Sequence, residues 1–203
     1  MSNYGDATRP LHGRRILVTG GATGIGAAGV EVLTDAGAHV VATYHQTQPR
    51  ETAAVSWLQC DVRDSAAVDA MVDDAVRILG GLDVLLHAAG LWQAGIPDQI
   101  TGDNIDFLVD TNLKATIFTN QAAYNVMREN GGRIINFGSG EAVMGSPLSA
   151  FYAATKGVVQ GVDAFHREGV GGRQHHRGGS RTRDGKLRAP TGCALSLDQK
   201  WPR

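Results

Sequence analysis

Tyr152 and Lys156 stand four residues apart in a segment whose apolar spacing predicts a helix. This i, i+4 spacing places both side chains on one face of the helix, so they can act on one substrate. An unperturbed tyrosine has a pKa of about 10, too high for a base at neutral pH, and a neighbouring ammonium favours the tyrosinate. The pair therefore predicts proton transfer by Tyr152, with Lys156 lowering the pKa of the phenol.

A glycine-rich segment, T-G-G-A-T-G-I-G at residues 19–26, lies between a short β-branched run at 15–19 and a helical pattern that begins at residue 24. Glycine permits positive φ and close backbone approach, and a helix N-terminus attracts a pyrophosphate. The segment therefore predicts a dinucleotide site, with the cofactor bound by Thr19, Gly20, Gly24, Ile25 and Gly26.

The end of the second predicted strand distinguishes the two nicotinamide cofactors. An acidic residue there would bind the ribose 2'-hydroxyl of NAD and repel the 2'-phosphate of NADP. The sequence has Tyr44 and His45 at this point, and no carboxylate precedes Glu51. We therefore expect NADP(H) to be favoured over NAD(H), with Tyr44 and His45 beside the cofactor, and NAD(H) remains the alternative.

Short apolar runs alternate with helical patterns before residue 166. The runs lie at 15–19, 39–43, 57–60, 82–87 and 133–137, and the helical patterns at 24–36, 68–79, 105–128 and from about 149. Parallel strands joined by helical crossovers form an open sheet, because the crossovers are right-handed and cover both faces. The pattern predicts an α/β fold, a Rossmann-type doubly wound parallel sheet with helices on both faces.

The composition is that of one globular domain. The chain has 203 residues, 42% of them hydrophobic, a formal net charge of -1 and two cysteines. These values exclude a collagen-like, disulfide-stapled or wholly disordered chain. No run approaches the roughly 20 apolar residues of a membrane span, and the first residues have no signal-peptide pattern. We therefore expect a cytoplasmic protein with no membrane partner, free thiols and no metal site.

The charge is distributed unevenly. Residues 1–165 carry 10 basic and 17 acidic residues, a net of -7, whereas residues 166–203 carry 9 and 3, a net of +6. Between residues 166 and 188 the only apolar side chains are Val170 and Leu187, too few to offset the entropy of folding. The sequence predicts a Rossmann domain over 1–168 and a disordered, basic, Gly/Arg-rich tail over 169–203.

Residues 12–165 resemble the short-chain dehydrogenase/reductase family. The segment at 19–26 matches the family's TGxxxGxG, residues 61–62 match its DV element, and 152–156 match YxxxK. His-Ala-Ala-Gly at 87–90 matches the family's NNAG only in part, since both asparagines are replaced. The resemblance implies that Asp61 and the Val62 backbone contact the adenine and that Ala89 and Gly90 line the cofactor.

The resemblance also implies a catalytic set. Ser139, 13 residues before Tyr152, would orient the substrate oxygen, Asn112 would position Lys156 through water, and Lys156 would hold the nicotinamide ribose. The implied function is an NAD(P)-dependent oxidoreductase that interconverts a secondary alcohol and a carbonyl of a small molecule, with Tyr152 as general acid and base. Family members pair two long helices, here 105–128 and 149–166, which implies a homodimer or homotetramer. Six residues could line the substrate side: Trp92, Gln93, Ala94, Glu141, Met144 and Phe151.

The resemblance ends after Glu168. A permitted back-translation of residues 169–185, read from its second base, gives G-W-A-A-D-N-I-T-V-V-A-V-A-P-G-T, which resembles the strand and Pro-Gly that the family has at this point. We infer a shifted reading frame near codon 169, a hypothesis that sequencing the gene tests. The chain would then lack the last family strands, and an inactive cofactor-binding form is an alternative function.

A second alternative takes the tail as it stands. An Arg/Gly-rich arm can contact nucleic-acid phosphates electrostatically. Its only aromatic residue is Trp201, and stacking on aromatic side chains supports much single-strand binding. Nucleic acid is therefore the less favoured partner. The adjacent His175 and His176 have no nearby Cys or acidic partner with metal-site spacing, so we expect no metal there.

Overall fold

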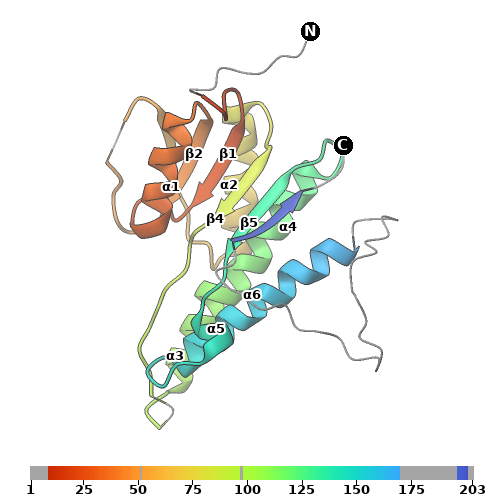
Figure 1. Ribbon diagram of the computed structural model, residues 1–203. Coiled ribbons are helices and arrows are strands. Elements are labelled where there is room, and N and C mark those ends of the chain that lie inside the picture. Colours follow the sequence, from red (N-terminus) through yellow and green to blue (C-terminus); the bar gives the residue numbers. More distant parts are fainter. Residues whose placement is uncertain (1–8, 51, 97, 170–195, 201–203) are drawn as a thin grey trace, which may run out of the picture.

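The computed structural model describes residues 9–50, 52–96, 98–169 and 196–200, with the backbone alone for 163–169 and 196–200 (Figure 1). Its centre is a six-stranded sheet in the order β3-β2-β1-β4-β5-β6. The strands are β1 (Arg15–Thr19), β2 (His39–Tyr44), β3 (Val55–Gln59), β4 (Val84–His87), β5 (Arg133–Phe137) and β6 (Ser196–Lys200).

The first five strands are parallel, as the sequence predicts. Leu17 in β1 pairs with Val41 on one side and with Leu85 on the other, and Leu85 pairs with Ile134. After β3 the chain returns to the opposite side of β1, so the strand order reverses between β1 and β4. In open α/β sheets this reversal leaves a crevice at the carboxyl ends of the strands. The Rossmann-type prediction is confirmed.

Alternating side chains of the strands build two cores. Leu17, Leu85 and Ile134 pack against α2 and α4 on one face, whereas Ile16, Val18 and their neighbours pack against α1 on the other (Figure 1). The helices are α1 (Gly24–Asp35), α2 (Ser65–Leu79), α3 (Gly102–Leu108), α4 (Ala115–Met127), α5 (Glu141–Met144) and α6 (Ala150–Gly169). None of the helices in the described ranges is both long and apolar enough to cross a membrane.

The structure divides the single helix predicted at 105–128. Between α3 and α4 lies η1, a π-helical turn over Val109–Lys114. A π-helical turn widens the helix by one residue and occurs often at functional sites. Apolar periodicity carries no signal for such a turn, so the sequence predicts one continuous helix.

One short part of the tail forms a strand. The sequence predicts a disordered segment over 169–203, but Ser196–Lys200 forms β6 and pairs antiparallel with β5, with Phe137 opposite Ser196. The reason is the edge of β5, whose backbone N–H and C=O groups offer a partner to any extended segment. The remaining tail expectations, the disorder, the shifted frame and the nucleic-acid arm, concern residues 170–195 and 201–203, which lie outside the described residues.

Candidate active site

The glycine-rich loop joins the carboxyl end of β1 to α1. Gly20 and Gly24 have φ of 67° and 53°, a left-handed conformation that suits glycine. A Cβ on Gly20 would lie 2.8 Å from backbone atoms of Ala89, and one on Gly26 would overlap the carbonyl oxygen of Gly20. The first turn of α1 has no side-chain cap in the described chain, and Thr23 is its N-cap. Its N–H groups therefore suit a pyrophosphate.

Two further predicted cofactor residues lie on opposite sides of this loop. Ile25 is 64% exposed on the first turn of α1, where a bound molecule would cover it. Thr19 is fully buried below the loop, with its hydroxyl 2.8 Å from Nδ1 of His87 and 3.4 Å from the backbone nitrogen of Ala89. Thr19 therefore supports the loop and the Ala89 segment from beneath instead of facing the open crevice.

The segment after β4 meets the predicted catalytic residues. A Cβ on Gly90 would lie 3.2 Å from Oδ1 of Asn112 and 3.4 Å from Nζ of Lys156. Because Gly20 in turn contacts Ala89, the glycine-rich loop and these two side chains lie on either side of one short backbone segment. The structure therefore brings together residues that are more than a hundred positions apart in the sequence.

Asn112 is fully buried in η1. Its Oδ1 accepts a hydrogen bond from the backbone nitrogen of Leu91 at 2.8 Å, and its Nδ2 donates to the Leu91 carbonyl at 2.9 Å and to Thr155 Oγ1 at 3.2 Å. One side chain thus ties the segment after β4 to η1 and to α6. Asn112 fixes the backbone that lies between the loop and Lys156.

Ser139 and Tyr152 interact at the carboxyl end of β5. Ser139 follows β5, and its Oγ accepts a hydrogen bond from the Glu141 backbone nitrogen at 3.2 Å. The pKa of Tyr152 is raised above its usual value of 10.0, first by burial and also by the negative charge of Glu141, while the hydrogen bond with Ser139 lowers it. A raised pKa leaves the phenol protonated at neutral pH, the form that can donate a proton, but makes it a weaker acid than a free tyrosine.

The expected lowering of the Tyr152 pKa by Lys156 is not seen in this structure. Lys156 is only 9% exposed, its Nζ donates to the carbonyl oxygen of Phe137 at 3.1 Å, and burial lowers its pKa. Its charge is not among the causes that act on the pKa of Tyr152, which rises instead of falling. The i, i+4 spacing places both side chains on one face, but the Phe137 carbonyl holds the ammonium.

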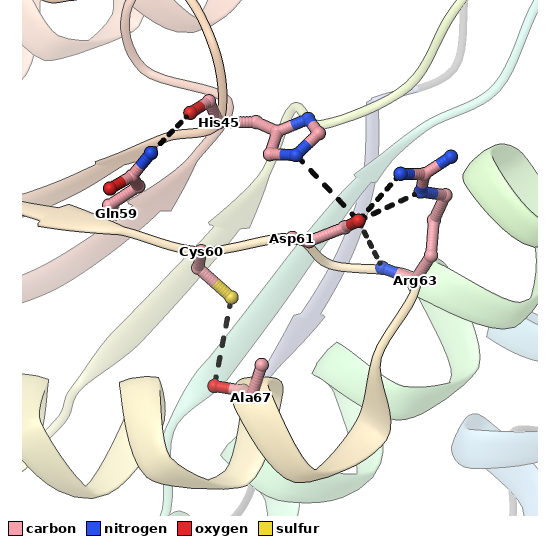
Figure 2. A network of polar contacts seen from close by, with 6 residues as sticks. All are labelled: His45, Gln59, Cys60, Asp61, Arg63 and Ala67. Carbon is pink, nitrogen blue, oxygen red and sulfur yellow. Dashed lines mark hydrogen bonds and ion pairs between the residues drawn. The ribbon is translucent and has the colours of Figure 1, made fainter.

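Figure 2 shows the Asp61 carboxylate between the His45 ring and the Arg63 guanidinium. Arg63 donates to Asp61 from Nε at 2.9 Å and from Nη2 at 2.6 Å, and its backbone nitrogen donates at 3.0 Å. His45 Nε2 lies 3.7 Å from Asp61 Oδ2. The hydrogen bond from the Arg63 side chain is the main reason that the pKa of Asp61 falls to about 2. The sequence reasoning missed Arg63, although its position two residues after Asp61 is a usable signal.

Tyr44 and Val62 join this cluster to the sheet. The carbonyl oxygen of Tyr44 accepts a hydrogen bond from the Cys60 nitrogen at 2.9 Å. Val62 packs against the core below α2, so its backbone is the part left near the cluster. The cluster therefore lies at the carboxyl ends of β2 and β3, the same edge of the sheet as the glycine-rich loop.

His87 is a second residue whose importance the sequence reasoning missed. It is the last residue of β4 and 3% exposed, and burial and the charge of Lys156 lower its pKa to about 3. Its imidazole is therefore neutral at physiological pH. The replacement of an asparagine of NNAG by this histidine was the sequence signal that marked the position.

A small pocket adjoins Tyr152. Its walls include Gln93, Ala94, Ile100, Asn104, Leu108, Phe151 and Tyr152. Of the six residues expected on the substrate side, Gln93, Ala94 and Phe151 line this pocket. The side chains of Trp92 and Met144 are 53% and 83% exposed elsewhere, and Glu141 accepts a hydrogen bond from Ser149. The lining is mainly apolar, with the two amides of Gln93 and Asn104 and the hydroxyl of Tyr152. In the described part of the chain no three His, Cys, Asp or Glu side chains gather as a metal site would require.

The comparisons with known proteins agree with this arrangement. The family model described as short chain dehydrogenase matches residues 14–169. An oxidoreductase of Sarocladium schorii is 34% identical over 76% of this chain, and versicolorin reductase of Emericella nidulans is 32% identical over 77%. A crystal structure of a short chain dehydrogenase from Burkholderia cenocepacia, in complex with NADP, is 33% identical with a TM-score of 0.70, and the match covers 78% of this chain and 69% of that one.

The matches extend over most of the described chain but not over the whole of the relatives. The aligned region covers 65% and 62% of the length of the two curated relatives. Within this chain the family model begins one residue before β1 and ends at the last residue of α6. Since the model spans well over half of the 203 residues, this chain belongs to the short chain dehydrogenase family.

Proposed function

We propose that the chain is an NAD(P)-dependent oxidoreductase that interconverts a secondary alcohol and a carbonyl group of a small molecule. The observation that carries this proposal is the interaction of Ser139 with the Tyr152 phenol beside a mainly apolar pocket. Lys156 and Asn112 contact Gly90, and the glycine-rich loop contacts the neighbouring Ala89. This arrangement supports a reaction at the pocket with a dinucleotide along the loop.

The residues present fit a nicotinamide dinucleotide. Gly20, Gly24 and Gly26 lie in a loop that leads into α1, whose first turn has no side-chain cap. A side chain at Gly20 or Gly26 would collide with nearby backbone, and one at Gly20 or Gly24 would strain the backbone. Asp61 and Val62 would hold the adenine, Ala89 and Gly90 would line the middle of the molecule, and Lys156 would hold the ribose nearest the reaction. When bound, the nicotinamide supplies or accepts the hydride.

The proton is moved by Tyr152. In carbonyl reduction its phenol donates the proton to the substrate oxygen, and in alcohol oxidation the phenolate takes that proton back. Ser139 donates a hydrogen bond that orients the oxygen and stabilises the developing charge. At neutral pH the Tyr152 phenol is protonated, because its pKa is raised above 10.0 by burial and by Glu141, and this is the form that carbonyl reduction uses.

The test of this mechanism is Tyr152→Phe. We expect NADPH oxidation in the presence of a panel of small ketones to fall by about 10²–10⁴-fold, the usual contribution of a general acid. The dissociation constant for NADPH, measured by fluorescence titration, serves as the control and should stay unchanged. Full activity in the variant would contradict the role of Tyr152. Cofactor binding without turnover in the unmodified chain would support the inactive alternative.

We further propose that NADP(H) is favoured over NAD(H). The support is His45 at the end of β2, an exposed imidazole where a carboxylate would repel the 2'-phosphate. The solved relative from Burkholderia cenocepacia is a complex with NADP.

The variant His45→Asp tests the preference. A carboxylate at the end of β2 should weaken NADPH binding by about tenfold and strengthen NADH binding, because it repels the phosphate and accepts from the ribose hydroxyl. His45→Gln is the matched control, which removes the imidazole without adding charge. An unchanged NADPH to NADH ratio in His45→Asp would place the discriminating residue elsewhere.

The proposal includes assembly of the chain into a homodimer or homotetramer. Ile117 on α4 and Val158 on α6 are 40% and 45% exposed, and these are the two helices that the family resemblance pairs between subunits. Light scattering on the purified chain distinguishes a monomer from either assembly. No described residue favours the nucleic-acid alternative.

A further inference from the structure

A row of polar side chains crosses the sheet just below the loop. Thr19 in β1 pairs with His87 in β4, and His87 pairs with Asn136 in β5. In each strand the residue two positions earlier, for example Leu85 before His87, faces α2 and α4. Because side chains alternate along a strand, the polar row faces the same side. All three of its members are buried.

Asn120 in α4 lies over this row. Met127 at the end of α4 packs against Gly132, immediately before β5, and α4 runs back along the sheet from there. Asn120 is seven residues before Met127, about 10 Å along the helix, and Asn136 is four residues after Gly132, about 13 Å along the strand. Asn120 is fully buried and lies three and seven residues before Ala123 and Met127, which belong to the core against the sheet. This helical spacing places Asn120 on the same face of α4, level with Asn136.

The hydrogen bonds of Thr19 point to one tautomer of His87. The Thr19 hydroxyl has one hydrogen to donate, and its oxygen already receives the Ala89 N–H. Among the described residues the acceptor within reach is His87 Nδ1, at 2.8 Å. Since the imidazole is neutral, Nδ1 accepts only if the proton is on Nε2. His87 therefore presents Nε2–H to the interior of the molecule.

Polar atoms of Asn120 and Asn136 also lack partners. Within the described chain His87 Nε2 and both amide atoms of Asn120 and of Asn136 are buried without a hydrogen bond. A buried polar group left in this way costs about 1–3 kcal/mol, and such groups in folded proteins are normally satisfied. Unpaired donors and acceptors that lie near one another but beyond bonding distance are typically bridged by water.

We propose that His87, Asn120 and Asn136 enclose a buried water-binding site beneath Gly90 and Lys156, and that His87 is a positioning residue. Its Nε2–H donates to the bound water, and its Nδ1 holds the Thr19 hydroxyl, which in turn accepts from Ala89. The chain of hydrogen bonds thus runs from the core to the backbone on which the cofactor would lie. Only this last consequence rests on the proposed function.

Nuclear magnetic resonance of the full chain with ¹⁵N-labelled histidine tests the tautomer without any cofactor. We expect the His87 signals, identified by their loss in His87→Asn, to be those of a neutral ring protonated at Nε2. A ring protonated at Nδ1 would overturn the proposal. A crystal structure should show ordered water within about 3.2 Å of Nε2, and a direct bond between His87 and Asn136 in its place would overturn the water site.

Cofactor affinity tests the positioning role. His87→Leu should weaken NADPH binding about tenfold, because the buried Thr19 hydroxyl loses its acceptor, and His87→Asn should restore affinity by offering an amide oxygen. Leu85→Val is the control, since it alters the same face of β4 without touching the hydrogen bonds. Equal affinities in His87→Leu and Leu85→Val would overturn the role. If the unmodified chain fails to bind NADPH, the proposed function fails, and the resonance and crystal tests still decide the water site.

Discussion

The most consequential residues of this protein are buried polar groups whose state is set by what surrounds them. His87 is the clearest example, because burial and the Lys156 charge lower its pKa from 6.5 to about 3. Asp61 is the opposite case near the surface, where the Arg63 side chain lowers its pKa to about 2. One residue is held neutral and the other is held charged, and each therefore has a distinct pH signature.

The pH dependence of unfolding should report His87. The pKa of His87 is lower in the folded state than in the unfolded state. Its contribution to the free energy of unfolding is therefore fully present above pH 6.5 and is lost as the pH falls toward about 3. Below pH 6.5 the free energy of unfolding should fall by up to about 1.4 kcal/mol for each pH unit. Urea unfolding of the full chain at a series of pH values measures it.

The variant His87→Asn is the control for that slope. It has no titrating ring, so the decline between pH 6.5 and 4 should flatten. Asp61 cannot account for the decline in this window, because its carboxylate contributes only as the pH falls from 3.8 toward about 2. The same slope in both proteins would refute the assignment to His87.

At the scale of the elements, the site depends on how closely β1, β4 and α1 approach one another. Gly20 lies against Ala89, and Gly26 lies against Gly20, so that two glycines join three elements. η1 also connects the elements, because its wide turn lets Asn112 hydrogen-bond to the backbone of Leu91. The elements are held by contacts that a side chain would prevent.

Gly26→Ala tests this close approach. The added Cβ would overlap the Gly20 carbonyl oxygen, so we expect a loss of stability of about 1–3 kcal/mol from overpacking and NADPH binding weakened at least about tenfold through displacement of the loop. Calorimetry and fluorescence titration measure the two effects.

Gly161→Ala is the matched control in α6. A Cβ there meets nothing within 4 Å, and alanine in place of glycine stabilises a helix interior by about 0.5–1 kcal/mol. Cofactor affinity should be unchanged. If Gly26→Ala behaved like Gly161→Ala, the close contact between the loop and α1 would not be needed for binding.

At the scale of the whole molecule, the proposed cofactor site draws on β1, β2, β3, β4, β5 and α6. Binding across so many elements requires the folded sheet, because residues of the unfolded chain are not held together. The edge strand β6 extends this sheet beyond β5 by antiparallel pairing. A ligand that binds only the folded state stabilises it by mass action.

The full chain should therefore unfold in one cooperative transition, and NADPH should raise its midpoint. At a concentration of about 100 times the dissociation constant, the gain is about 2.7 kcal/mol. Thermal scans with NADPH, with NADH and with neither measure this directly. A chain with no cooperative transition, or one that neither cofactor stabilises, would favour the inactive alternative.

The sequence by itself determined the fold class, the bounds of β1 and β5 and the position of the glycine-rich loop. These features follow from local rules, since alternation, apolar periodicity and glycine placement act over a few residues. β1 and β5 lie at the predicted residues, and α1 begins at Gly24 as predicted. The predicted cofactor and catalytic residues also follow from short motifs, and their roles stay predictions.

Only the tertiary structure decided how those residues act on one another. The Phe137 carbonyl binds Lys156, Arg63 binds Asp61, and His87 lies between Thr19 and Asn136. These neighbours are distant in sequence or depend on a side-chain rotamer, so residue spacing carries no information about them. The same reason explains the raised pKa of Tyr152 and the pairing of β6. Burial and edge pairing are properties of the assembled sheet, and they do not exist until distant segments meet.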